Sequence, residues 1–121
     1  MSRSRLKILV VDDEPMIVEV FQEILGQKYD VHSASTASEV HRVLDRDRFD
    51  VLITDWNMPG LNGLELAERM CDHRDCRVIV ITGADEDSMA GIRSSGVSVH
   101  RKPVRWKALL NELESIEVSS P

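Results

Sequence analysis

Four short segments of this sequence combine residue types that handle metal ions and phosphate. They are Asp12-Asp13-Glu14, Asp55, Thr82-Gly83 and Lys102-Pro103. Carboxylates that lie close together repel one another until a proton or a cation relieves the repulsion. Oxygen ligands favour a hard cation, Mg²⁺ ahead of Mn²⁺ or Ca²⁺, and a lysine ammonium supplies a point charge for an anion. If folding brings the segments together, they predict a site for phosphoryl chemistry.

Each segment follows a predicted strand, and the first, third and fourth of the five strands are nearly continuous apolar runs, as strands covered on both faces should be. Strands are predicted at Leu6–Val11, Asp30–Ala34, Asp50–Thr54, Arg77–Thr82 and Val97–His100. Helical spacing of apolar residues occupies the intervals between them. The first helix begins at Pro15, with Ile17, Val20, Phe21 and Ile24 on its apolar stripe, and the second follows a capping box of Thr36 and Glu39. Further helices are predicted from Gly63 to about Cys71, from Asp85 to Ser95, and from Trp106 to Ile116.

This alternation of strands and helices predicts right-handed βαβ crossovers and therefore a parallel sheet. The predicted fold class is α/β, a flavodoxin-like (βα)5 doubly wound five-stranded sheet with strand order 2-1-3-4-5. In such a sheet ligands bind beyond the carboxyl ends of the strands, where the strand order reverses. All four chemical segments fall at that edge, whereas the second strand ends in Ser33-Ala34-Ser35 and is expected outside the pocket.

The composition fits one domain spanning 1–121, with a core at about 6–117. The 121 residues are 42% hydrophobic and carry a net charge of −6, which argues against disorder and against direct binding to nucleic acid. The apolar run behind the N-terminus is too short for a signal sequence or a membrane span. Cys71 and Cys76 lack a metal-binding spacing, so we expect reduced thiols in a cytoplasmic protein.

The same residues also have ordinary structural interpretations. Asp12 and Asp13 would suit the first turn of a helix, whose dipole favours acids. Asp55 would satisfy loop amides, Thr82 would end a strand in a common turn, and Lys102 would be a solvated surface lysine. The acidic pair taken together with Asp55 favours the metal-site interpretation, and the long segment 56–63 leaves space above the Asp55 carboxylate.

In this order the motifs resemble those of the receiver domain of two-component response regulators. The matching stretches are Leu9-Val10-Val11-Asp12-Asp13-Glu14-Pro15, Thr54-Asp55-Trp56-Asn57-Met58-Pro59-Gly60 with Gly63, Thr82-Gly83-Ala84, and Lys102-Pro103. The resemblance extends from about Leu6 to the last helix. It implies a phosphoacceptor, similar to single-domain chemotaxis-type regulators, that is phosphorylated by a histidine kinase or a histidine phosphotransfer protein. It implies no enzyme activity beyond phosphorylation and dephosphorylation of the domain itself.

The resemblance assigns the metal site to four residues. It implies that Asp13, Asp55 and the backbone carbonyl of Asn57 hold Mg²⁺ directly, and that Asp12 acts mainly through metal-bound water. In this family, the positions of Asn57 and Ala84 tune the lifetime of the phosphoaspartate.

The remaining roles concern the phosphoryl group. The resemblance implies that Asp55 is the nucleophile, that Thr82 hydrogen-bonds a phosphoryl oxygen and that Lys102 pairs with it. It also implies a cis peptide bond between Lys102 and Pro103, which is common only before proline. Phosphoryl transfer needs mainly positioning and charge neutralisation, so this small set of residues is chemically sufficient.

One position departs from the family pattern. The family usually carries Tyr or Phe three residues before the lysine, where this chain has Val99. Val99 cannot swing inward to report phosphorylation as the aromatic residue does, and the adjacent His100 should face the opposite side of the sheet. Two explanations follow: either the coupling of phosphorylation to the output is relaxed, or readout uses another element, such as the helix at 85–95 or its loop. His32, His41 and His73 are predicted to be surface residues, and Trp106 is predicted to pack on the last helix.

Three other functional classes compete with a phosphoacceptor. An aspartate-nucleophile phosphatase would carry a second acid two residues after Asp55, where Asn57 stands. A flavodoxin-like nucleotide-binding module would place a Ser-, Thr- and Gly-rich loop where Asp12-Asp13-Glu14 would repel phosphate. A receiver-like module that binds partners without phosphorylation is favoured only by Val99.

Overall fold

The computed structural model describes residues 5–55, 57–58, 61–62, 76–83 and 97–119. Its elements in chain order are β1 (Lys7–Val11), α1 (Pro15–Leu25), β2 (Asp30–Ala34), α2 (Ala37–Arg46), β3 (Val51–Asp55), β4 (Asn57–Met58), β5 (Leu61–Asn62), β6 (Arg77–Thr82), β7 (Ser98–Arg101) and α5 (Trp106–Ser119). The helices predicted from Gly63 and from Asp85 lie outside the described residues, as do Trp56, Cys71, His73 and Ala84.

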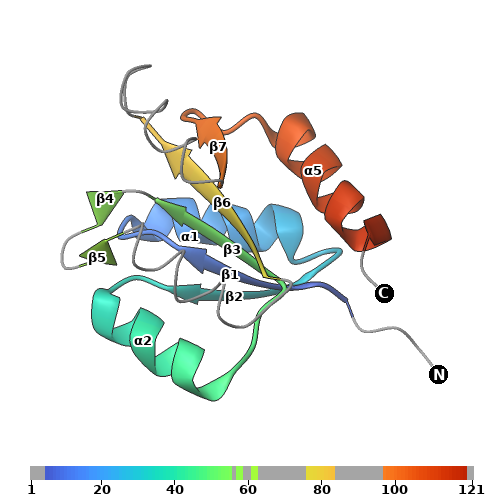
Figure 1. Ribbon diagram of the computed structural model, residues 1–121. Coiled ribbons are helices and arrows are strands. Elements are labelled where there is room, and N and C mark those ends of the chain that lie inside the picture. Colours follow the sequence, from blue (N-terminus) through green and yellow to red (C-terminus); the bar gives the residue numbers. More distant parts are fainter. Residues whose placement is uncertain (1–4, 56, 59–60, 63–75, 84–96, 120–121) are drawn as a thin grey trace.

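Five strands form one parallel sheet in the order β2-β1-β3-β6-β7 (Figure 1). Counted along the chain without the short β4 and β5, this is the predicted order 2-1-3-4-5, so the predicted fold class is confirmed. β1 pairs with β2 on one side and with β3 on the other. The strand order therefore reverses at β1 and β3, and a ligand site is expected beyond their carboxyl ends.

The core forms two layers, one on each face of the sheet. Figure 1 shows α2 on one side of the sheet and α1 with α5 on the other. Alternate residues of β1 point to opposite faces of the sheet. Leu9 and Val11 pack in the layer that faces α2, and Ile8 and Val10 pack in the layer that faces α1 and α5. All four are at most 1% exposed. Because helices cover both faces, the central strands are unbroken apolar runs, as predicted.

The apolar stripe of α1 differs from the predicted one. The buried residues are Val18, Phe21 and Leu25, whereas Val20, which was predicted on the stripe, is 38% exposed. Both sets keep helical spacing, so periodicity alone did not decide which of two overlapping stripes faces the sheet. Phe21 belongs to both stripes, and its ring meets that of Trp106 on α5 edge to face, with the centroids 4.9 Å apart. The predicted packing role of Trp106 is confirmed.

The capping box at the start of α2 is confirmed with one change. The Glu39 amide donates to Thr36 Oγ1 at 3.2 Å, as predicted. The Glu39 carboxylate accepts its return bond from the amide of Ser35 at 2.9 Å, one residue before the cap. Val40 and Leu44 on this helix are buried. Local sequence thus sets where α2 begins, and its apolar stripe sets its orientation.

Small differences appear at the ends of the strands. β1 and β3 begin one residue later than predicted, and β7 runs from Ser98 to Arg101 rather than from Val97 to His100. The segment after Asp55, predicted as a loop, contains the antiparallel pair β4–β5, in which Asn57 lies opposite Asn62. No described helix is both long enough and apolar enough to cross a membrane.

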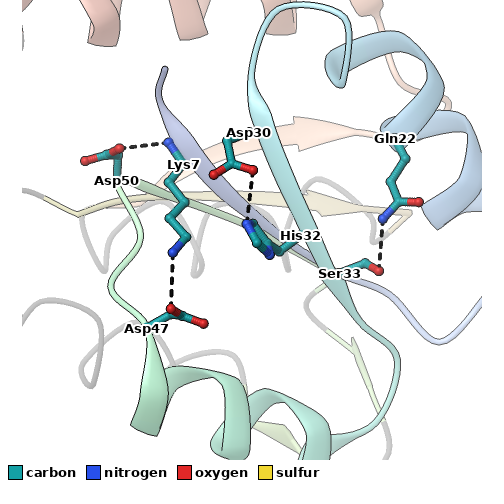
Figure 2. A network of polar contacts seen from close by, with 7 residues as sticks. All are labelled: Lys7, Gln22, Asp30, His32, Ser33, Asp47 and Asp50. Carbon is teal, nitrogen blue, oxygen red and sulfur yellow. Dashed lines mark hydrogen bonds and ion pairs between the residues drawn. The ribbon is translucent and has the colours of Figure 1, made fainter. Parts of the chain in front are cut away.

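Polar contacts fasten the other end of the sheet. Lys7 lies between two acids, with Nζ 3.2 Å from Asp47 Oδ1 and the backbone amide donating to Asp50 Oδ2 at 2.8 Å (Figure 2). The Lys7 ammonium also lies over the Phe49 ring, 5.2 Å from its centroid. These contacts tie the start of β1 to the connection between α2 and β3. They lie at the end of the strands opposite the acidic segments.

His32 lies at the surface, as predicted, but is partly covered. Its side chain is 41% exposed, and its ring packs edge to face against that of Phe49, with the centroids 5.6 Å apart. Asp30 Oδ1 lies 3.1 Å from His32 Nε2, although this nitrogen is not aligned for a hydrogen bond (Figure 2). His41 is exposed, as predicted.

Candidate metal and phosphoryl site

The predicted chemical residues converge on the edge of the sheet at which the strands end. Asp12 directly follows β1, Asp55 ends β3, Thr82 ends β6 and Lys102 directly follows β7. Backbone hydrogen bonds continue the sheet into these positions. The Asp12 amide donates to the Ala34 carbonyl at 3.3 Å and the Lys102 amide donates to the Thr82 carbonyl at 2.8 Å. The hydrogen bonds of the sheet therefore fix the backbone positions from which these side chains extend.

Three carboxylates form a cluster at this edge. One carboxylate oxygen from each of Asp12, Asp13 and Asp55 lies within 4.8 Å of the others. Asp12 is buried at 4% exposure, Asp55 is half-buried and Asp13 is exposed. The predicted juxtaposition of the acidic pair with Asp55 is thus present. Like charges at this spacing favour either a retained proton or a bound cation.

Asp12 contacts two different partners through its two oxygens. Oδ1 accepts a hydrogen bond from the Glu14 amide at 3.0 Å, and Oδ2 lies 3.6 Å from Lys102 Nζ. Burial raises the pKa of Asp12, the Glu14 bond and Lys102 lower it, and the charges of Asp55 and Asp13 raise it again. The result is a pKa above the ordinary value. Asp12 therefore serves both the start of α1 and the acidic cluster.

Lys102 contacts two carboxylates of the cluster. Its Nζ lies 3.3 Å from Asp55 Oδ2 and 3.6 Å from Asp12 Oδ2, and its side chain is only 27% exposed. Burial lowers the pKa of Lys102, but the charges of Asp12 and Asp55 and the bond to Asp55 raise it further, so the net shift is upward. Lys102 is therefore a charged partner of the acids and not a solvated surface lysine. The bond between Lys102 and Pro103 is cis, as expected.

Space is available beside the end of β6. Thr82 is buried, and a Cβ added at Gly83 would meet no atom within 4 Å. A missing side chain next to a hydroxyl leaves room for a group that approaches the carboxylates. The contact between Thr82 and a phosphoryl oxygen remains a prediction.

The donor set fits a hard divalent cation. Several carboxylate oxygens within reach of one another are the ligands that Mg²⁺ and Ca²⁺ prefer, and no cysteine or histidine joins this described cluster. Asn57 follows Asp55 by two residues, and its backbone lies in β4. That the Asn57 backbone carbonyl binds Mg²⁺ remains a prediction.

The strand that carries Val99 has a polar feature that sequence reasoning missed. Glu112 on α5 accepts a hydrogen bond from Ser98 Oγ at 3.0 Å, and its Oε1 lies 2.6 Å from His100 Nε2. Val99 packs instead against the layer that faces α2, so the predicted opposite orientation of Val99 and His100 is confirmed. The i, i+2 spacing of Ser98 and His100 marks one face of a strand, but nothing local pointed to Glu112.

Comparison with known proteins agrees with this geometry. The family model for the response regulator receiver domain matches residues 8–114. The positive alginate biosynthesis regulatory protein of Pseudomonas aeruginosa is 35% identical over 114 residues, which cover 90% of this chain. The chain spans less than half of that relative, 46% of its length.

Solved structures with the same fold include receiver domains with beryllofluoride. The BeF3-activated DrrB receiver domain superposes with a TM-score of 0.84 at 26% identity, covering 94% of this chain and 98% of that one. The response regulator TrrA of Thermotoga maritima, in complex with Mg²⁺ and BeF, gives 0.78 at 27% identity, covering 92% and 98%. With the matched family model and the acidic edge of the sheet, these findings show that the chain belongs to the response regulator receiver domain family.

Proposed function

We propose that this protein is a phosphoacceptor of a two-component phosphorelay, phosphorylated at Asp55 by a sensor histidine kinase or a histidine phosphotransfer protein. One observation carries the proposal. The Asp55 carboxylate lies at the switch point of the sheet, with Lys102 Nζ at 3.3 Å and the Asp12 and Asp13 carboxylates within 4.8 Å. Nucleophile, cation and metal-type ligands therefore share one small space.

The residues divide the reaction between them. A carboxylate oxygen of Asp55 attacks phosphorus, the bond from phosphorus to the donor breaks, and the donor keeps the electron pair. Lys102 and the Thr82 hydroxyl stabilise the oxygens of the transferred group, since this chemistry depends on positioning and charge. The product is an acyl phosphate, which is labile and suits a signal that resets. The domain thus catalyses only its own phosphorylation and dephosphorylation.

Asp13, Asp55 and the Asn57 carbonyl would hold Mg²⁺ directly, with Asp12 in the surrounding layer. When bound, Mg²⁺ supplies positive charge that offsets the clustered carboxylates and the incoming phosphoryl oxygens. The beryllofluoride complexes of the similar structures support this assignment by analogy.

Incubation with acetyl phosphate and Mg²⁺ tests the proposal. Intact-mass measurement should show addition of one phosphoryl group, and Asp55→Asn should abolish it because the amide is no nucleophile. Asp45→Asn, which changes an exposed aspartate on α2, is the matched control and should be labelled like the wild type. Labelling that survives in Asp55→Asn would refute the assignment.

Partners and context belong to the same proposal. We place the reaction in the cytoplasm, where cysteines such as Cys71 and Cys76 are kept reduced. The chain would form one receiver unit over 1–121, with its core at 6–117. Phosphorylation would change which proteins this unit binds. Neither nucleic acid nor a membrane would be a direct partner. Phosphotransfer from a phosphorylated histidine phosphotransfer protein, followed by the same mass measurement, tests the donor class.

A further inference from the structure

A buried hydroxyl lies next to the nucleophile. Thr54 precedes Asp55 in β3 and is 1% exposed. Its neighbours in the sheet are Val11 on β1 and Val80 on β6, both buried in the layer that faces α2. Thr54 therefore occupies an apolar position, at which a valine of nearly the same shape would be expected.

The hydroxyl makes one described hydrogen bond, and that bond goes to the backbone of the nucleophile. Thr54 Oγ1 donates to the carbonyl oxygen of Asp55 at 3.0 Å. Burying a hydroxyl costs free energy unless it is hydrogen-bonded. The bond therefore explains how a threonine is tolerated here, and it constrains the peptide by which the chain leaves β3.

The Asp55 carboxylate has supports of its own. Asp55 is opposite Ile81 in the pairing of β3 with β6, and Oδ2 contacts Lys102. The Asp55 carbonyl instead begins the chain that reaches Asn57 two residues later. The Thr54 bond therefore acts on the direction of that chain more than on the carboxylate.

We infer that Thr54 is a positioning residue for the metal site. Its hydroxyl holds the Asp55 carbonyl and so directs the backbone toward Asn57, whose carbonyl is a proposed Mg²⁺ ligand. This inference rests on the proposed function. It separates two properties, because Mg²⁺ affinity should depend on the hydroxyl while the attack by Asp55 at saturating Mg²⁺ should not.

Two substitutions separate the hydroxyl from the methyl group. Thr54→Val keeps the shape and removes the hydroxyl, whereas Thr54→Ser keeps the hydroxyl and removes a buried methyl group. The probe is Mg²⁺ alone, titrated calorimetrically into the metal-free protein. Thr54→Val should raise the Kd for Mg²⁺ by roughly threefold to tenfold, the worth of one ordinary hydrogen bond. Thr54→Ser should bind Mg²⁺ within about twofold of the wild type, yet unfold at a lower temperature.

The rate of phosphorylation by acetyl phosphate at saturating Mg²⁺ should stay within about twofold of the wild type in both variants. Thr54→Ala, which also lacks the hydroxyl, should repeat the weaker Mg²⁺ binding and keeps the test valid if Thr54→Val does not fold.

The outcomes distinguish this inference from the proposed function. Wild-type affinity in Thr54→Val, or equal weakening in Thr54→Ser, would overturn the positioning role while phosphorylation at Asp55 stands. A wild-type protein that neither binds Mg²⁺ nor accepts a phosphoryl group would remove the proposed function and this inference with it.

Discussion

At the scale of single residues, Lys102 offsets part of the negative charge of the acidic cluster. Its ammonium lies within 3.6 Å of oxygens from both Asp12 and Asp55, and the three side chains are 27%, 6% and 13% exposed. Pairs this sheltered interact more strongly than surface pairs, and removing one partner leaves charge behind. Lys102 and a divalent cation therefore have overlapping electrostatic roles at this edge.

Removal of the Lys102 charge should destabilise the metal-free protein. Lys102→Met should lower the free energy of unfolding by about 1–2 kcal/mol, less than for a fully buried pair because Lys102 is partly exposed. Urea denaturation in the presence of a chelator measures this loss. Lys107→Met, an exposed lysine on α5, is the control and should change stability by less than about 0.5 kcal/mol.

The same variant should bind Mg²⁺ more tightly, because a cation no longer competes for the carboxylates. Addition of Mg²⁺ should thus recover part of the lost stability. Unchanged stability in Lys102→Met without metal would show that the observed contacts contribute nothing.

At the scale of elements, α5 is fastened to the edge strand β7 by a polar contact. Glu112 receives bonds from Ser98 and His100, whose side chain is 15% exposed. Elsewhere α5 packs through Leu109, Leu113 and Ile116, all buried. The polar contact fixes how α5 is rotated about its axis and where it lies along β7, a strand that lacks the family's usual aromatic residue. Val99, on the other face, leaves this contact intact.

Loss of the Glu112 charge should lower the free energy of unfolding by an amount that depends on pH. The hydrogen bond from His100 lowers the pKa of Glu112, burial opposes this shift, and the bond from Ser98 adds to it, so the net direction is down. A group whose pKa is lower in the folded state than in the unfolded state contributes to the free energy of unfolding. For Glu112 this contribution is complete above the pKa of the unfolded state, about 4.3, and is lost as the pH falls through the pKa of the folded state.

Glu112→Gln should therefore cost about 1 kcal/mol of unfolding free energy at pH 7. The difference from the wild type should shrink below about pH 4. Denaturant unfolding from pH 7 to pH 3 measures the trend, with Glu23→Gln, which changes an exposed acid on α1, as control. A difference in unfolding free energy between Glu112→Gln and the wild type that stays constant across this pH range would contradict the pairing of Glu112 with His100 and Ser98.

At the scale of the whole molecule, folding assembles the acidic cluster that is the candidate metal site. Asp12 and Asp13 follow β1, Asp55 ends β3, and only the pairing of these two strands brings their carboxylates within 4.8 Å. The unfolded chain holds these residues far apart in the sequence, so it has no comparable site. A ligand that binds only the folded state stabilises that state by mass action.

Mg²⁺ should accordingly raise the Tm. At a concentration 100 times its Kd the gain should be about 2.7 kcal/mol, a shift of several degrees for a domain of this size. Asp13→Asn should remove most of the Mg²⁺-dependent shift, whereas Glu19→Gln, an exposed acid on α1, should retain it. Differential scanning calorimetry with Mg²⁺ and with a chelator makes the measurement. A shift of equal size in Asp13→Asn would exclude this cluster as the site.

Much of the fold could be predicted because its determinants are local. Unbroken apolar runs mark strands covered on both faces, as Ile8 to Val11 show. The Thr36 and Glu39 pair marks the start of α2 because its hydrogen bonds lie within one turn. The apolar stripe of α1 could not be predicted in full, since Val18 and Val20 both fit a helical period and only the folded structure distinguishes them, with Val18 buried and Val20 exposed.

By itself, the sequence determined the order of the five strands of the parallel sheet and of the described helices, and the position of each strand end to within one residue. These follow from periodicity and from the residue types after each apolar run, and they sufficed to place Asp12, Asp13, Asp55, Thr82 and Lys102 at one edge. Only the tertiary structure decided the contacts among them. Lys102 lies between Asp55 and Asp12, Thr54 holds the Asp55 carbonyl, and Glu112 joins His100. The two ion-pair contacts and the Glu112–His100 contact join distant segments, and the Thr54 bond depends on the backbone path at the end of β3. Such distances are set by packing of the whole sheet, which no local pattern records.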